Sequence, residues 1–328
     1  MRTRRNAVVI GVLVAVLGVL GVVGAMSGDY PVPLGDVLGV VSGSTEGLAR
    51  TVVVEWRLPR IAAAVVVGAA LGVAGAVFQS VTRNPLASPD VLGLSNGAFV
   101  GLLTALVLVG SSWEARTAGA LVGGLGAALL ITALSRGTGI GGFRFIMVGI
   151  AVSSMAASLG TWLLLQVELD TALFASAWGA GTLAGVDAAT VTAAGLLAAG
   201  FFAVVPAFAP ALRQLELGDD LAAATGVRVP AVRSLALGTG VALVCIATTV
   251  AGPVAFVALA APQIARRSAR TPHLPLVASA LTGAVVLLGS DLIAQHVLPV
   301  TLPVGVVTVV VGGCYLAHLL AREMRRRG

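Results

Sequence analysis

The feature that most constrains this chain is a series of apolar runs, each close to the roughly 20 residues that a helix needs to cross a bilayer. Hydrophobic residues make up 58% of the 328 residues and charged residues only 10%, whereas soluble domains carry about 25% charged residues. Together with a mean hydropathy of +1.02, these runs predict an all-α polytopic membrane protein. A transmembrane barrel would need alternating segments of about 10 residues, and the sequence lacks them.

Breakers and apolar periodicity divide residues 1–328, which we expect to form a single membrane domain, into ten predicted helices. They fall at 7–26, 59–82, 91–110, 115–135, 144–165, 188–209, 232–251, 254–267, 274–296 and 303–321. The eighth is too short for an independent span, so we expect it to pack inside the bundle. The first follows three arginines, as a signal peptide would, but it is longer than the usual apolar core and no clear cleavage site follows. We therefore expect a retained first helix.

The net charge of +6 rests entirely on arginine, because the chain has no lysine. These arginines lie at the ends of apolar runs, which favours a role in membrane topology over nucleic-acid binding. With ten helices, 16 of the 20 basic residues lie on one side, and only Arg50, Arg57, Arg60 and Arg116 lie on the other. The positive-inside rule then predicts that both termini are cytoplasmic. A phosphate-binding P-loop needs a lysine, so an ordinary ATPase site is excluded.

The most informative stretch is 57–101. Arg57 and Arg60 flank a proline at its outer end, and small residues four apart, such as Gly68 and Gly72, favour close helix packing. The same spacing recurs at Gly93, Gly97 and Gly101, at Gly119 and Gly123, and at Gly181 and Gly185. A polar break at 83–89 follows, where Ser88 is expected to cap the next helix. This break is either a plain interhelical turn or a rigid element that closes a pathway.

Two further segments are predicted to be short helices outside the bilayer. Residues 173–179 lie in the outer segment 166–187, and residues 217–226 lie in the largest inner loop. In the inner helix, Asp219 and Asp220 occupy the first turn and Gly226 suits the C-terminal cap. A helix of this length is marginal alone in water. It either docks on a cytoplasmic partner or rests on the bundle.

Catalytic constellations are lacking, so we expect no enzyme activity. The three histidines lie at different helix ends and form no metal site, and Cys245 and Cys314 are expected to be unpaired. Asp291 is the one carboxylate predicted within a span, where ionisable residues are functional candidates. It is either a hydrogen-bonded structural residue or a proton relay, and the sequence suggests no basic partner for it.

Several ordered motifs together resemble one family over nearly the whole chain. They are Arg57-Leu58-Pro59-Arg60, the run 68–79, Asn84-Pro85-Leu86-Ala87, 92–98, Leu217-Gly218 with 222–226, 252–257, Pro262-Gln263 and 302–307. This set resembles the FecCD-type permeases of ABC importers for iron-siderophores, heme and cobalamin.

The resemblance implies a ten-helix bundle of the cobalamin-permease type in a bacterial plasma membrane. It implies pairing with a second permease subunit, as a homodimer or a heterodimer. Two cytoplasmic ATPase subunits would dock underneath, and an extracytoplasmic binding protein would deliver the substrate. This chain would bind no cofactor, since ATP and Mg²⁺ belong to the ATPase, and no nucleic acid.

Roles also follow from the resemblance, residue by residue. Arg57 and Arg60 match outer arginines that pair with glutamates of the binding protein. The inner gate corresponds to Asn84, Leu86, Gly141 and Gly142. The helix that couples to the ATPase corresponds to Leu217, Gly218, Asp219, Asp220, Ala222, Ala223 and Gly226.

Departures from the family pattern bear on docking and on the gate. Gln295 replaces a further docking arginine of cobalamin permeases, Thr301 replaces the usual Glu before Leu-Pro, and Cys314 replaces a usual Pro. Gly141 and Gly142 replace polar gate residues. These changes would suit one half of a heterodimer.

The leading hypothesis is a permease for a ferric siderophore that works by alternating access. Heme and cobalamin remain alternative cargoes. An ion-coupled secondary transporter that uses Asp291, or a scaffold that transports nothing, are the rival classes.

Overall fold

The computed structural model describes residues 2–89, 93–110, 112–135 and 143–327. All regular secondary structure in these ranges is helical. The elements are α1 (Arg2–Met26), α2 (Leu34–Ser42), α3 (Leu48–Thr51), the π-helical turn η1 (Val52–Arg57), α4 (Leu58–Thr82), α5 (Leu94–Leu108), α6 (Trp113–Leu134), α7 (Phe143–Leu164), α8 (Leu169–Gly179), α9 (Ala188–Leu215), α10 (Asp219–Ala224), α11 (Val229–Ala251), α12 (Val257–Ala269), α13 (Leu276–His296) and α14 (Val304–Arg327).

Each of the ten expected membrane segments coincides with one of these helices, namely α1, α4 to α7, α9 and α11 to α14. In the described ranges, seven helices are long and apolar enough to cross a membrane. The apolar stretches of α5 and α14 are shorter, and α12 has only 13 residues. The helical bundle is therefore confirmed, while the count of ten spans stays a prediction.

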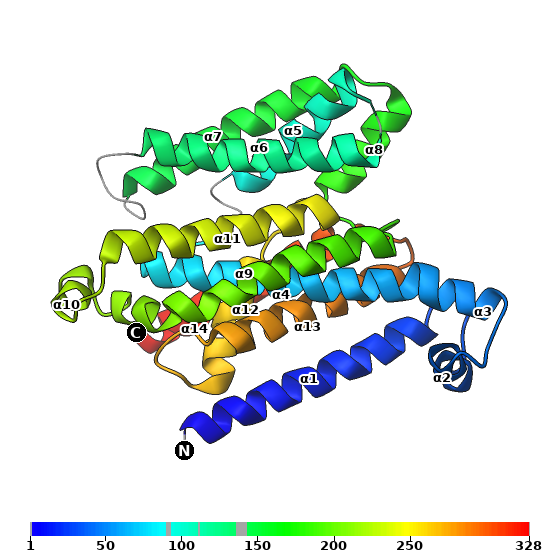
Figure 1. The fold of residues 1–328 in the computed structure, drawn as a ribbon, viewed down its shortest axis with the longest axis horizontal. Coiled ribbons are helices and arrows are strands. Elements are labelled where there is room, and N and C mark those ends of the chain that lie inside the picture. The colour runs from blue at the N-terminus through cyan, green and yellow to red at the C-terminus, as the bar shows by residue number, and fades with distance from the viewer. Residues whose placement is uncertain (1, 90–92, 111, 136–142, 328) are drawn as a thin grey trace.

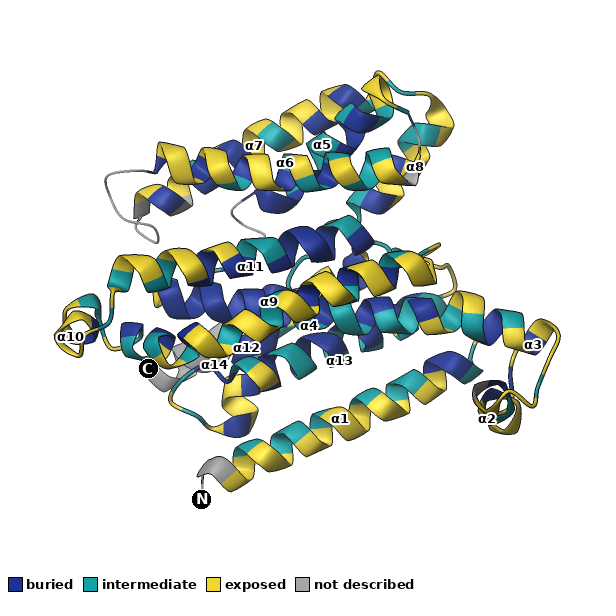
Figure 2. Ribbon diagram, viewed as in Figure 1, coloured by how far each residue is buried: buried dark blue, intermediate teal, exposed yellow. Residues whose placement is uncertain are grey.

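The central helix of the bundle is α4, which packs against α13, α11, α12 and α9 (Figure 1). Much of its length is buried, as the dark stretches of its ribbon in Figure 2 show. Ala63, Val67 and Phe78, for example, are at most 1% exposed. Apolar contact along so much of its length fixes α4 as the axis on which the other helices are placed.

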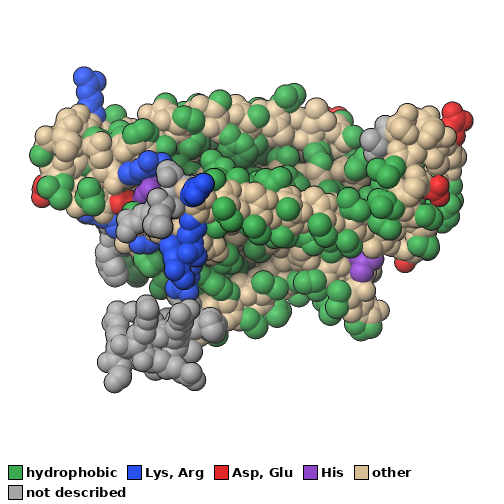
Figure 3. All heavy atoms as spheres, turned by 90° about the horizontal axis from the view of Figure 1, so that it is seen from below, with side chains coloured by type: hydrophobic (Ala, Val, Ile, Leu, Met, Phe, Trp, Pro, Cys, Tyr) green, Lys and Arg blue, Asp and Glu red, His purple; other side chains and the backbone are tan. Residues whose placement is uncertain are grey.

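Two groups of helices flank this axis. In one, α5 packs on α6 and α7 and meets the rest of the bundle through α11, while α1 lies along α13 on the opposite side (Figure 1). Both chain ends and α10 lie at one end of the bundle, and α2, α3 and α8 lie at the other. Figure 3 shows arginine side chains gathered at the end with the termini and apolar side chains over most of the length between the ends.

Glycines allow the closest of these helix contacts. A Cβ atom on Gly72 would fall on the carbonyl oxygen of Ser279 in α13, and one on Gly101 would fall on that of Gly119 in α6. The small-residue spacing therefore does bring helix backbones together, as predicted. The exception is the pair Gly181 and Gly185, which lies in the α8–α9 connection with positive φ values of 80° and 71° and so serves turns.

The structure corrects two helix boundaries. The helix containing α4 begins earlier than residue 59, because α3, η1 and α4 form one apolar helical segment from Leu48 to Thr82. The outer segment before it is ordered by α2 and a small apolar core that includes Val32 and Val53. The next helix, α5, begins at Leu94, later than predicted, and its N-cap residue is Gly93, which has a φ of 78°. A left-handed residue at that position suits only glycine well. The predicted cap at Ser88 stays a prediction, because residues 90–92 lie outside the described ranges.

Candidate functional site

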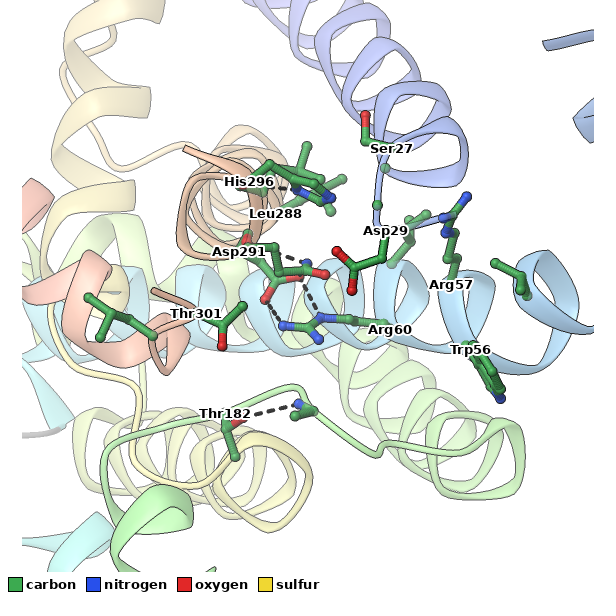
Figure 4. A pocket seen from close by; sticks show the side chains of 18 of the residues that line it. Ser27, Asp29, Trp56, Arg57, Arg60, Thr182, Leu288, Asp291, His296 and Thr301 are labelled. Atoms are coloured by element: carbon green, nitrogen blue, oxygen red, sulfur yellow. Dashed lines mark hydrogen bonds and ion pairs between the residues drawn. The ribbon is translucent and has the colours of Figure 1, made fainter. Parts of the chain in front are cut away.

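At its outer end, α4 is tied to α13 by a buried ion pair. The guanidinium of Arg60 donates from Nε to Oδ2 of Asp291 at 2.9 Å and from Nη2 to Oδ1 at 2.8 Å (Figure 4). Asp291 is 1% exposed, and Gln295 donates a further hydrogen bond to its Oδ2 at 2.7 Å. The expectation that Asp291 has no basic partner was therefore wrong. This bidentate geometry is the strongest that arginine and a carboxylate form.

Arg57 serves the same end of the bundle in another way. Its Nη1 donates to the carbonyl of Ala25 at 2.8 Å, and its Nη2 donates to that of Tyr30 at 2.6 Å. These bonds tie the end of α1 and the connection to α2 onto the first turn of α4. The sequence singled out both arginines but did not show that each is bonded within the chain.

Both arginines line a cavity of about 620 Å³ at this end. Its wall combines charged and polar groups, among them Asp29, Trp56 and Thr301, with apolar residues of α1 and α13 (Figure 4). Gln295, the replacement for a family arginine, also lines it. Such a cavity can accept a polar or acidic group from outside the chain, since it offers arginine donors at its wall.

At its inner end, α4 stops at a left-handed arginine. Arg83 is the C-cap with φ 52° and ψ 28°, which ends the helix and turns the chain. Asn84 then accepts a hydrogen bond at Oδ1 from the backbone N–H of Leu86 at 2.9 Å, and its carbonyl accepts from the N–H of Ala87 at 3.1 Å. We call residues 84–86 the polar turn. Leu86 is 50% exposed at its tip.

The polar turn lies within the predicted break at 83–89, and whether it closes a pathway stays a prediction. Asn and Pro form such turns because the Asn side chain bonds its own backbone two residues on and Pro fixes φ. The other two gate candidates, Gly141 and Gly142, lie outside the described residues.

The predicted inner-loop helix forms as α10. It begins after Gly218, whose φ of 122° requires glycine, and Gly226 after its end also has a positive φ of 87°. Ala222 faces the bundle and is 1% exposed, whereas Leu217 and Leu221 are 71% and 60% exposed. A short helix with large apolar side chains directed outward is typical of a surface that a partner covers.

Three polar contacts join α10 and the end of α9 to the rest of the bundle. Ser80 in the last turn of α4 donates from Oγ to Oε1 of Glu216 at 2.7 Å. Arg233 of α11 donates from Nη2 to both carboxylate oxygens of Asp219 at 2.9 Å. Arg83 lies 3.5 Å from the same carboxylate. No pattern in the sequence singled out Ser80, Glu216 or Arg233.

Two buried glutamines join the inner half of α4 to α12. Gln79 donates to the carbonyl of Leu259 at 3.0 Å, and Gln263 donates to Oε1 of Gln79 at 2.6 Å. Both glutamines are buried, so each bond offsets a polar group removed from water. Gln79 lies next to Ser80 and one turn before Arg83 in the chain, so this pairing holds that part of α4 in place.

The remaining titratable groups are scattered through the described residues. Across the described part of the chain, no cluster of His, Cys, Asp and Glu has the makings of a metal site. Cys245 and Cys314 are free thiols. His273 lines a cavity of about 310 Å³ at the inner end, where burial and the charge of nearby Arg213 lower its pKa.

Comparisons with known proteins find similar proteins that cover nearly the whole chain. The FecCD transport family matches residues 12–322. The ferric enterobactin transport system permease protein FepG of Escherichia coli (strain K12) is 43% identical over 326 residues, which cover 99% of each chain. The Fe(3+) dicitrate transport system permease protein FecD of the same organism is 36% identical and covers 83% of this chain and 85% of its own.

A solved structure shares the fold. A metal-chelate type ABC transporter in an inward-facing conformation superimposes with a TM-score of 0.83 at 22% identity, covering 95% of this chain and 98% of its own. At that identity the likeness concerns the fold, and it extends over nearly all of the helices described above.

Proposed function

This chain belongs to the FecCD transport family, and from that premise we propose that it is the membrane-spanning permease subunit of an ABC importer for a ferric siderophore. The observation that carries the choice of cargo is the 43% identity to a ferric enterobactin permease over 99% of both chains. Relatives that import other iron chelates, such as ferric dicitrate, share less of the sequence. A catecholate siderophore of the enterobactin type is therefore the first cargo to test.

The permease would act with separate partners. Because the sequence has no lysine for a P-loop, ATP hydrolysis falls to partner ATPase subunits. The exposed Leu221 on α10 and the exposed Leu217 just before it support this segment as the surface that an ATPase covers. A second permease subunit would complete the pathway. Gln295 and Thr301 would suit a heterodimer whose other member supplies the missing charges.

The outer cavity is the proposed dock of the binding protein. Arg57 and Arg60 both line it, and an acidic side chain of the partner is the group that arginines bind best. Arg57 is the better test, since its loss leaves no buried carboxylate unpaired. We expect Arg57→Gln to weaken docking, and more so at low salt than at high salt. Docking unchanged at low salt would contradict this assignment.

The proposed orientation places both termini and α10 in the cytoplasm and the outer cavity on the opposite face. Arginine side chains gather at the end with the termini (Figure 3), which agrees with the positive-inside rule. Tags on the two termini should be accessible only after the membrane is made permeable. Accessibility in intact spheroplasts would contradict the orientation.

Reconstituted uptake tests the function as a whole. The permease, its ATPase, the second permease subunit and the binding protein are placed in proteoliposomes. Accumulation of the metal is then measured with radioactive iron for ferric enterobactin, other ferric siderophores and heme, and with radioactive cobalt for cobalamin. We expect ATP-dependent accumulation of a ferric siderophore. Accumulation driven by a proton gradient without the ATPase would favour a secondary transporter. The geometry of Asp291 argues against that rival, because both of its carboxylate oxygens are already bonded within the chain, by Arg60 and Gln295.

A further inference from the structure

The inner end of α4 meets α10 at a carboxylate shared by two arginines. Asp219 is bound bidentately by Arg233, whose side chain is only 17% exposed. Its second neighbour, Arg83, is 47% exposed and lies at 3.5 Å, which is the long end of an ion pair. Asp219 therefore has one firm partner on α11 and one loose partner on α4. Only the loose partner can leave at little cost, because exposed pairs contribute little.

The position of Arg83 makes this loose contact consequential. Arg83 ends α4 and directly precedes the polar turn at 84–86, whose tip is the exposed Leu86. Its backbone is left-handed, a conformation that is strained for a non-glycine residue and persists only where the surroundings hold it. A contact of the Arg83 side chain therefore restrains the residue whose backbone sets the direction of the polar turn.

The chain on the other side of the contact has a hinge. Glu216 is held by Ser80 and Asp219 by Arg233, and between these two anchors lies Gly218 with its φ of 122°. Glycine tolerates large changes of φ there. A displacement of α10 about Gly218 that carries Asp219 with it lengthens the Asp219–Arg83 contact, whereas Glu216, on the other side of Gly218, stays bonded to the buried Ser80.

We propose that the Arg83–Asp219 pair is a latch that holds the polar turn to α10 and opens when α10 is displaced. The proposal rests on the proposed function, in which an ATPase covers α10, and it identifies Arg83 as the positioning residue through which that movement reaches the turn. An exposed pair contributes at most about 1 kcal/mol, so its loss shifts the population of turn positions up to about fivefold.

The chain offers a matched control. Arg270 ends α12 as Arg83 ends α4, with a φ of 50° against 52°, and it is likewise exposed at a helix C-cap. Within the described residues, however, Arg270 makes no ion pair. Arg270→Gln thus removes the same side chain from the same backbone conformation without touching a latch.

The first test measures the polar turn itself, without transport. Leu86→Cys is introduced with Cys314→Ala, since Cys314 is exposed and Cys245 is buried, and the rate of maleimide labelling is followed on the purified full-length chain. We expect Arg83→Gln to change this rate by up to about fivefold. Arg83→Lys and Arg270→Gln should leave it near the parent value. Equal rates in all four proteins would overturn the latch.

The second test measures coupling in the reconstituted complex with ferric enterobactin as the probe. We expect Arg83→Gln to keep ATP hydrolysis but to lower iron accumulated per ATP hydrolysed by up to about fivefold, and Arg83→Lys to restore the ratio. An unchanged ratio in Arg83→Gln, or a parallel fall of hydrolysis and uptake, would overturn the latch. Absence of ATP-driven uptake in the parent complex would instead overturn the proposed function, while the labelling test still decides the latch.

Discussion

The two ends of α4 are each joined to a neighbouring element by an arginine and an aspartate, and the two pairs differ in kind. At the outer end, Arg60 binds a carboxylate that is 1% exposed through two bonds of 2.8 and 2.9 Å. At the inner end, the Arg83 guanidinium lies 3.5 Å from the carboxylate of Asp219, and about half of the Arg83 side chain is exposed. Arg233 already binds the same carboxylate. The same two residue types therefore make a fixed joint on one side and an exchangeable contact on the other.

Burial explains the difference. A buried carboxylate that loses its partner keeps its desolvation cost, so the outer pair stays closed. An exposed pair exchanges its partner for water at little cost and is screened by salt. A transporter that moves its inner side against a fixed outer frame would need this contrast.

The largest expected effect is at the outer pair. Arg60→Gln should destabilise the protein by about 3–5 kcal/mol, because it leaves Asp291 buried without its cation. Thermal unfolding of the purified full-length chain measures the loss. Arg50→Gln is the control, since Arg50 is exposed and makes no ion pair within the described residues. A loss no larger than that of the control would show that the outer pair is not a fixed joint.

A smaller effect is expected at Ser80, the buried anchor beside the inner contact. Ser80→Ala removes the hydroxyl that donates to Glu216, and we expect a loss of about 1 kcal/mol in unfolding free energy. Ser158→Ala is matched to it, because the Ser158 hydroxyl is exposed and bonds only within its own helix. If both variants lose the same stability, the Ser80–Glu216 bond does not anchor the end of α9.

A comparable loss is expected on the outer side at the start of α9. The Asp187 carboxylate accepts the N–H of Thr190 at 2.6 Å. Hydrogen bonds from the side chain of Thr190, first, and from its backbone N–H lower the pKa of Asp187. Asp187→Ala should cost about 1 kcal/mol, whereas Asp187→Asn, which can also cap a helix, should cost less. In the parent, this contribution is present above the ordinary Asp pKa and is lost as the pH falls through the lowered value. The unfolding free energy of the parent and of both variants is measured across the acid range. An Asp187→Asn variant that loses as much as Asp187→Ala, or a parent that keeps its advantage in acid, would contradict this prediction.

The smallest effect concerns pH at the inner end. Burial and Arg213 lower the pKa of His273, so the folded protein binds a proton there less readily than the unfolded chain does. Stability should therefore fall as the pH drops below about 6.5, the ordinary histidine value. His273→Gln should flatten that part of the profile. An unaltered slope would show that His273 does not titrate differently in the two states.

The elements that the sequence predicted are those fixed by local signals. Long apolar runs identified the ten main helices, and the acids that precede Gly226 identified α10. Both kinds of signal are local, because the residues that make up a cap or an apolar period lie within a few positions of each other. The left-handed residue that ends α4 was not foreseen, because arginine carries no signal for that conformation. The helical segment that contains α4 begins at Leu48, before the predicted residue 59. Val52 to Val54 are separated from the long apolar run by Glu55, Trp56 and Arg57, which suggested a loop.

The contacts that define the candidate site depend on tertiary register. Arg60 and Asp291 were each singled out, yet they are 231 residues apart and nothing local marks them as partners. The same holds for Ser80 and Glu216, which are 136 residues apart. Only the packing of α4 against α13 and α9 brings these groups together, so their pairing had to come from the structure.

The contrast between the two ends of α4 is tested most directly by double-mutant cycles on both pairs at low and high salt. One cycle uses Arg60→Gln and Asp291→Asn, and the other uses Arg83→Gln and Asp219→Asn, with unfolding free energy measured on the full-length chain. We predict a coupling energy above about 1 kcal/mol at the outer pair that salt hardly changes, and one below about 1 kcal/mol at the inner pair that salt removes. Equal coupling energies with the same salt dependence would contradict the account.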